Sequence, residues 1–178
     1  MPITQSLQVP IAQTMLAEFE IQAPITRKFL ERLPENKLTW RPHSKSMTAG
    51  QLAYHLAKVP GAIVYLVTKN PAQLPTNFIY PQPASKAEIL MALDESIEAV
   101  RAGLPLFDDA EMEETWRMVS DDREVFAESR GGFLRDVMFS HWYQHRGQLC
   151  VYLRLLNVPV PASFGPSADE PPLLMQKA

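Results

Sequence analysis

The chain has 178 residues, of which 46% are hydrophobic and 21% charged, the balance of an ordinary globular protein. Its formal net charge is −3 and no block of lysine or arginine stands out, so we expect no nucleic-acid partner. The single cysteine excludes an intrachain disulfide, and we find neither a signal-peptide pattern nor an apolar run of about 18 residues. We expect one cytoplasmic domain over residues 1–178, without a membrane partner and with an irregular tail from about residue 158.

Two helices are predicted in the first part of the chain. Residues 11–33 place apolar side chains near the helical period, and Pro24 inside this segment predicts a kink. A second helix begins after Thr48, which has capping-box spacing to Gln51, and its apolar stripe continues to about residue 66. The Pro60-Gly61 pair inside it predicts a bend.

Two further helices follow a proline-rich connection. Residues 85–103 form the third, again with capping-box spacing at its start, and residues 132–156 form a long fourth helix that ends before Pro159. Between them, residues 104–130 show the least helical pattern, with two short apolar runs around Asp121-Asp122 that are compatible with a hairpin. The predicted fold class is all-α: a four-helix bundle with long loops and a short β-hairpin between the third and fourth helices.

The fourth predicted helix carries two histidines where apolar residues are expected. His141 and His145 lie four residues apart in its apolar stripe, and His55 interrupts the stripe of the second helix between Leu52 and Val59. A buried polar group without a partner costs about 1–3 kcal/mol. Residues at i and i+4 share one helical face and can share one ion. Three imidazoles with an open fourth position are typical of a catalytic metal site, whereas closed structural sites use four protein ligands.

A second interpretation stays open at this point. The HxxxH spacing is common, and a histidine in a bundle interior can simply be a hydrogen-bonded core residue. His55 joins the other two only if the second and fourth helices are neighbours. The spacing therefore supports a metal site and core histidines about equally.

Residues around the histidines have simpler expected roles. Trp40 and Trp142 are predicted packing anchors, and His43 is expected in a surface loop before the second helix. Cys150 is rotated by about 140° from His145 at 100° per residue, so we interpret it as a small packing residue.

Two polar residues of the fourth helix are singled out. Gln148 lies one turn from His145 and is the candidate to hold water or substrate beside the metal ligands. Arg146 is expected to form a structural ion pair with an acidic residue of a neighbouring segment. The catalytic group itself is left open between a metal-bound water and a thiolate.

Several enzyme classes are excluded by missing motifs. The sequence contains no HExxH, GxSxG, GxGxxG or P-loop pattern. No carboxylate lies near the histidines in the sequence. A general base must therefore come from elsewhere in the fold or be a metal-bound hydroxide.

The histidine-bearing motifs resemble the DinB/YfiT-like superfamily. The similarity rests on "LAYHLA" after a "WRP" loop, on "HWYQHRGQL" in the last helix, and on "TWRMVSDDREVF" and the tail "LRLLNVPVPASFGPSADE". It extends from about residue 19 to about residue 170. Gln144 departs from the pattern, because many relatives have a further histidine there.

The resemblance implies a four-helix bundle, often dimeric, that holds a divalent metal ion through three histidines. Carried over to this chain, the metal ligands are His55, His141 and His145. Known members include metal-dependent thiol transferases and isomerases that use low-molecular-weight thiols. The ion expected here is Ni²⁺ or Zn²⁺, with Fe or Mn as alternatives, since imidazole suits several of these metals.

The sequence thus leads to three hypotheses of different kinds. The first is a homodimeric metal-dependent hydrolase or thiol S-transferase that acts on a small molecule such as a low-molecular-weight thiol. The alternative is a non-catalytic, metal-stabilised helical-bundle binding module. In the third, the histidines are polar core residues of a metal-free bundle.

Overall fold

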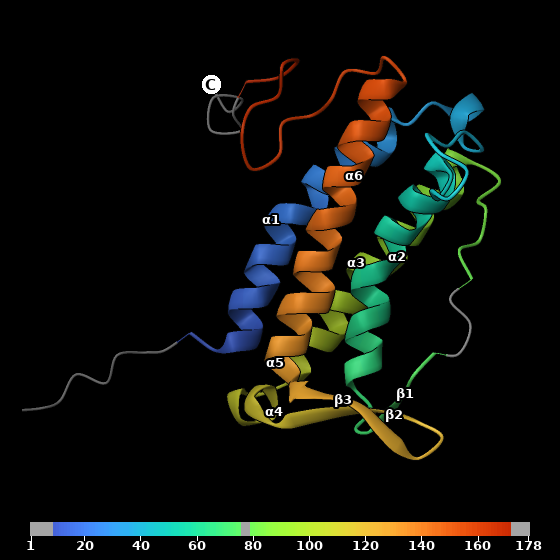
Figure 1. The fold of residues 1–178 in the computed structure, drawn as a ribbon. Coiled ribbons are helices and arrows are strands. Elements are labelled where there is room, and N and C mark those ends of the chain that lie inside the picture. Colours follow the sequence, from blue (N-terminus) through green and yellow to red (C-terminus); the bar gives the residue numbers. More distant parts are fainter. Residues whose placement is uncertain (1–8, 76–78, 172–178) are drawn as a thin grey trace, which may run out of the picture.

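Four helices form the body of the molecule in a computed structural model that describes residues 9–75 and 79–171. They are α1 (Ile11–Arg32), α2 (Ala49–Val67), α3 (Lys86–Gly103) and α6 (His141–Leu155) (Figure 1). Helices α1 and α2 each pack against both α3 and α6, so the four helices close into a ring around a shared interior. The predicted four-helix bundle is confirmed.

The core lies where the apolar stripes of these helices meet. Large side chains with an exposed fraction of at most 1% come from all four helices: Phe19, Phe29, Leu30, Leu52, Leu56, Leu93, Trp142 and Leu149. Helices α1 and α2 continue through Pro24 and Pro60 without a break. Packing of the apolar faces outweighs the one helical hydrogen bond that each proline removes.

The starts of α2 and α3 follow the predicted caps with one difference. At α2 the Gln51 amide donates to Thr48 Oγ1 over 3.1 Å, and the Thr48 amide donates to Gln51 Oε1 over 3.0 Å, which completes the capping box. At α3 the Ser85 hydroxyl accepts from the Glu88 amide over 3.1 Å, but the Glu88 carboxylate accepts from the Ala84 amide. The second half of that predicted box is therefore displaced by one residue.

The hairpin between α3 and the last helix is present at one end of the bundle (Figure 1). Strands β2 (Thr115–Ser120) and β3 (Arg123–Ser129) pair antiparallel across Asp121 and Asp122, whose φ angles are 46° and 62°. Positive φ at both central residues is what a tight two-residue hairpin turn requires, and aspartate tolerates it.

Other short elements were not predicted. Strand β1 (Ala72–Gln73) pairs parallel to β2, and α4 (Asp109–Glu113) has a capping box at Asp108. Two 3₁₀ turns occupy Glu35–Lys37 and Leu104–Leu106.

The last long helical stretch differs from the prediction in its start and its winding. It begins at α5 (Arg130–Phe133), where Ser129 Oγ accepts from the Gly132 amide over 3.1 Å. A π-helical segment, Leu134–Ser140, follows before α6. The His141 amide donates to the carbonyl of Asp136, five residues back, so this segment turns by less per residue than an α-helix. The predicted long helix over residues 132–156 is thus present as a continuous helical stretch over residues 130–155, but part of it is wound as a π-helix, which the sequence did not predict.

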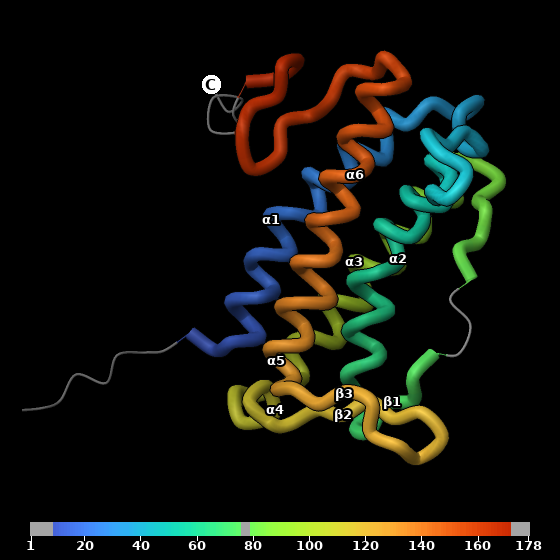
Figure 2. Tube along the Cα trace, viewed as in Figure 1, coloured from blue at the N-terminus to red at the C-terminus, as the bar shows by residue number. Residues whose placement is uncertain are grey.

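The segment after α6 runs back beside α1 and α6, as the tube view shows (Figure 2). Asn157 ends the helix with a φ of 57°, which agrees with the predicted stop signal. Residues 157–171 contain neither helix nor strand, and they are held by Arg154–Asp169 and Arg32–Glu170 ion pairs. None of the described helices combines the length and apolar character that a bilayer crossing needs.

Candidate metal centre

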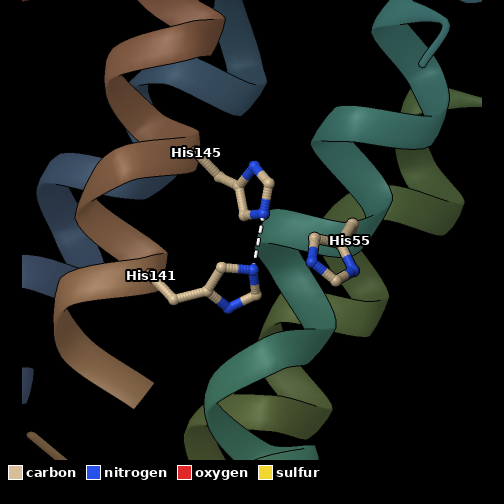
Figure 3. Close-up of side chains that lie close together, drawn as sticks. All are labelled: His55, His141 and His145. Atoms are coloured by element: carbon tan, nitrogen blue, oxygen red, sulfur yellow. Dashed lines mark hydrogen bonds between the residues drawn. The ribbon is translucent and has the colours of Figure 1, made fainter. Parts of the chain in front are cut away.

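Three histidines from two helices converge between α2 and α6 (Figure 3). One ligand nitrogen from each of His55, His141 and His145 lies within 4.8 Å of the other two. The ring centroids are 4.4 Å apart for His141 and His145, 4.7 Å for His55 and His145, and 5.3 Å for His55 and His141. The condition that the sequence left open, that α2 and α6 are neighbours, is met.

The hydrogen bonds of His145 determine where its protons lie. Its Nδ1 is 2.9 Å from Gln148 Oε1, and its Nε2 is 2.7 Å from His141 Nε2. An amide oxygen accepts only, so we assign the proton of His145 to Nδ1 and leave Nε2 as a free base. His141 must then donate through its own Nε2. A cation that replaced this shared proton would meet two nitrogen lone pairs.

Two buried ring nitrogens have no hydrogen-bond partner in the described part of the chain. They are His55 Nε2 and His141 Nδ1. Buried polar atoms are normally paired, and an orphaned one calls for an explanation such as an absent ion. His141 faces His145 through its Nε2, so its orphaned Nδ1 says nothing about an ion there, whereas the orphaned His55 Nε2 fits a bound cation better than a self-contained hydrogen-bonded core.

The surroundings favour the neutral form of His55 and His141. Burial, together with the neighbouring His145 and His141, lowers the pKa of His55 to about 4. Burial and His145 also lower the pKa of His141, whereas the nearby carbonyl of Val137 opposes this shift without forming a hydrogen bond of normal geometry. A neutral imidazole is the form that binds metals.

The site is partly open to solvent. His55 and His141 are half-buried, while His145 is 8% exposed. Among the described residues, the group of histidine, cysteine and carboxylate side chains that could hold a metal has these three members and no fourth. Three nitrogen ligands at an accessible position leave room for water or a substrate atom.

A tyrosine not singled out from the sequence lies against the site. The ring of Tyr80 meets that of His55 edge to face, with centroids 5.3 Å apart, and the Tyr80 carbonyl accepts from Gln51 Nε2 over 2.9 Å. Tyr80 lies within the proline-rich connection of residues 70–84, whose path no local pattern predicts. Only the fold could reveal this contact.

The other predicted residues fall into three groups. Gln148 contacts the site through His145, and its role of holding water or substrate stays a prediction. His43 is exposed, and Trp142 is a buried packing residue that stacks on Phe19 at 5.4 Å. The half-buried Trp40 packs edge to face on Tyr152 at 5.7 Å, and the half-buried Cys150 packs against the core.

The prediction for Arg146 was wrong. Its side chain is buried and donates to Gln22 and Thr26 of α1, which are neutral, and no carboxylate of the described residues pairs with it. Burial lowers the pKa of Arg146 to about 10, so the guanidinium stays charged at neutral pH.

Comparisons with known proteins agree with this architecture. The model of the DinB superfamily matches residues 18–149. A protein of Bacillus subtilis (strain 168), the uncharacterized YrdA, is 27% identical over 159 residues, which cover 87% of this chain and 89% of that protein.

Two solved structures share the fold. A DinB-like protein from Bacillus cereus ATCC 10987 superposes with a TM-score of 0.65 at 21% identity, over 83% of this chain and 93% of that one. The DinB-like protein YjoA from Bacillus subtilis gives a TM-score of 0.63 at 17% identity, over 83% and 96% of the respective chains.

Proposed function

This chain belongs to the DinB superfamily, and from that premise we propose that it is a metal-dependent enzyme in which His55, His141 and His145 hold one divalent ion. The observation that carries the proposal is the convergence of three ring nitrogens at a partly open position without a fourth protein ligand among the described residues. Ni²⁺ and Zn²⁺ are the proposed ions, with Fe or Mn as alternatives, since all accept imidazole nitrogen.

The reaction we propose is hydrolysis or thiol S-transfer on a small molecule, with a low-molecular-weight thiol as one reactant in the second case. A divalent ion in this position supplies Lewis acidity, which favours loss of a proton from water or from a thiol. The protein's own part is to hold the three ligands. Gln148 fixes the ring orientation of His145, and Tyr80 packs against His55.

The pKa values of His55 and His141 are shifted by burial, by neighbouring histidines and, for His141, by the Val137 carbonyl, and not by a carboxylate of the described residues. The three ligands are neutral as well, so they would leave the ion's charge uncompensated. Such a site favours an anionic fourth ligand, and deprotonated water or thiol are both of that kind. We also propose a homodimer in solution, which light scattering tests directly.

The test of the metal site is elemental analysis of untagged protein. We expect about one equivalent of a divalent metal per chain in the wild type, loss of this metal in His145→Ala, and full retention in His43→Ala, a matched histidine exposed in a loop. Circular dichroism should show the same helix content in all three proteins. Full metal occupancy in His145→Ala would overturn the site.

The test of the enzyme is separate. Protein loaded with the ion found should be screened with hydrolysable esters and amides and with thiol-transfer substrates, always beside His145→Ala. Turnover that disappears in the variant supports the enzyme. Metal-dependent stability without turnover of either class favours the non-catalytic binding module.

A further inference from the structure

Arg146 is a buried cation that has no counter-charge among residues 9–75 and 79–171. It is 2% exposed, and its three hydrogen bonds go to neutral oxygens: from Nη1 to Thr26 Oγ1 (3.2 Å) and the Gln22 carbonyl (3.4 Å), and from Nη2 to Gln22 Oε1 (2.7 Å). Within the described residues its Nε–H makes no hydrogen bond. Burying an ion without an opposite charge is costly, and neutral acceptors offset only part of that cost.

The aromatic rings around Arg146 supply limited compensation. Its guanidinium carbon lies 5.1 Å from the centroid of Tyr143 and 5.0 Å from that of Phe164. The acidic residue nearby is engaged elsewhere, because Glu18 accepts from the Tyr143 hydroxyl and pairs with Arg135, both at 2.7 Å. The positive charge of Arg146 is therefore still available to an anion.

A pocket of about 290 Å³ adjoins this side chain. One wall is α6 with Arg146 and Cys150, and the other is the segment of residues 160–167, which contributes Ser163, whereas the Ser167 hydroxyl donates to the Val160 carbonyl. The lining also includes the apolar side chains Phe29, Val160, Pro161 and Phe164, and it contains no acidic residue. The pocket thus combines one positive charge, the hydroxyl-bearing Ser163 and apolar walls.

Gly147 keeps part of this wall open. It lies in the middle of α6 and lines the pocket, where glycine costs about 1 kcal/mol relative to alanine. A Cβ built at Gly147 meets nothing within 4 Å, so close packing does not require glycine there. An open approach to the pocket accounts for a residue that helix stability disfavours.

We propose that this pocket binds a small organic carboxylate, with Arg146 as its counter-charge. A planar carboxylate matches the donor geometry of a guanidinium, and the apolar walls suit a small hydrocarbon body. A single cation fits a singly charged carboxylate better than a doubly charged phosphate. The pocket is separate from the metal centre, because Arg146 contacts α1, whereas His141 and His145 face His55 of α2. Either proposal can therefore fail without the other.

Benzoate is the probe for the test, with neutral benzamide and inorganic phosphate as comparisons. The readout is the ¹H–¹⁵N signal of the Arg146 Nε–H, identified by its loss in Arg146→Lys. Benzoate should shift this signal in a saturable way in wild type and in His145→Ala, which separates the pocket from any binding at the metal. Benzamide and phosphate should shift this signal at least about tenfold less than benzoate does. An unresponsive signal, or equal responses to benzoate and benzamide, would overturn the proposal.

A pair of variants at Cys150 supplies the matched control. This residue lies four positions after Arg146, on the same helical face, and it lines the pocket. Cys150→Asp places a tethered carboxylate beside the guanidinium, whereas Cys150→Asn has the same shape without the charge. We expect Cys150→Asp to raise the melting temperature above that of Cys150→Asn and to abolish the benzoate response, which Cys150→Asn retains. An unchanged benzoate response in Cys150→Asp would contradict the assignment.

Discussion

The indole Nε1 of Trp142 donates a 2.8 Å hydrogen bond to the main-chain carbonyl of Leu56. These residues directly follow His141 and His55. In a regular helix the Leu56 carbonyl would accept from the amide four residues on, but that residue is Pro60, which has no N–H. The proline therefore frees an acceptor inside α2, and α6 supplies its donor beside the histidines. This contact fixes how the two histidine-bearing helices meet.

Replacing Trp142 with phenylalanine should weaken both the fold and the metal site. The Leu56 carbonyl would lose its donor inside the core, which costs about 1–3 kcal/mol in free energy of unfolding. The control is Trp116→Phe, because the Trp116 indole donates in the same way to the Lys69 carbonyl, over 2.7 Å, at the sheet end of the bundle. Urea unfolding should show a lower free energy of unfolding in both variants. A competitive chelator titration should show weaker metal binding only for Trp142→Phe. Equal effects on metal affinity would mean that the Leu56 contact does not position the site.

Gln148→Ala should lower metal affinity without unfolding the protein. Gln148 Oε1 accepts from His145 Nδ1 and so holds the ring with Nε2 toward the site. Removing such a partner typically weakens metal binding about 10–100-fold. Gln144→Ala, also at an exposed position of α6, is the control and should bind metal as the wild type does. Isothermal titration calorimetry decides the point, and identical dissociation constants for the two variants would refute this role of Gln148.

The metal-free protein should lose stability as the pH falls from about 6.5 to about 4. Burial holds the folded-state pKa of His55 near 4, below its usual value of 6.5. Between these values the unfolded chain binds a proton that the folded chain does not, so the free energy of unfolding rises with pH across this window and falls on acidification. Urea unfolding in the presence of chelator at several pH values measures the slope. His55→Gln should reduce the slope and leave the part that His141 contributes, and an equal slope in both proteins would show that His55 is not responsible.

Alanine at two helical glycines should have opposite effects. A Cβ at Gly61 would lie 2.9 Å from Ser96 Cα, where α2 and α3 meet and the Gly61 amide donates to Ser96 Oγ. Gly61→Ala must separate these helices, at a cost of about 1–3 kcal/mol. Gly147→Ala meets no neighbour and should gain up to about 1 kcal/mol from helix propensity. Denaturant midpoints measured side by side give both signs, and a stabilising Gly61→Ala would show that the helices can part without loss.

The helices and the spacing of the histidine pair are local properties of this sequence, and the sequence alone determined them. Helical periodicity and side-chain caps act over three or four residues, so the caps at Thr48 and Ser85 and the shared face of His141 and His145 could be predicted. The turn at Asp121-Asp122 is local too, since two positive φ angles favour such residues. The apolar stripe of the second helix offered His55 as a possible third ligand, and the resemblance to the DinB superfamily favoured it over a core role.

Tertiary packing decided which side chains of these elements come into contact and which buried polar groups find a partner. The orphaned nitrogen of His55 and the contact between Trp142 and Leu56 depend on how α2 meets α6, and the π-helical turn before His141 was not predicted from the sequence. Arg146 finds its acceptor in Gln22, 124 residues away, and no local pattern could show that this partner is neutral. The physical reason is range: periodicity and capping are settled within a turn of helix, whereas hydrogen-bond partners and buried charges are settled where distant segments pack.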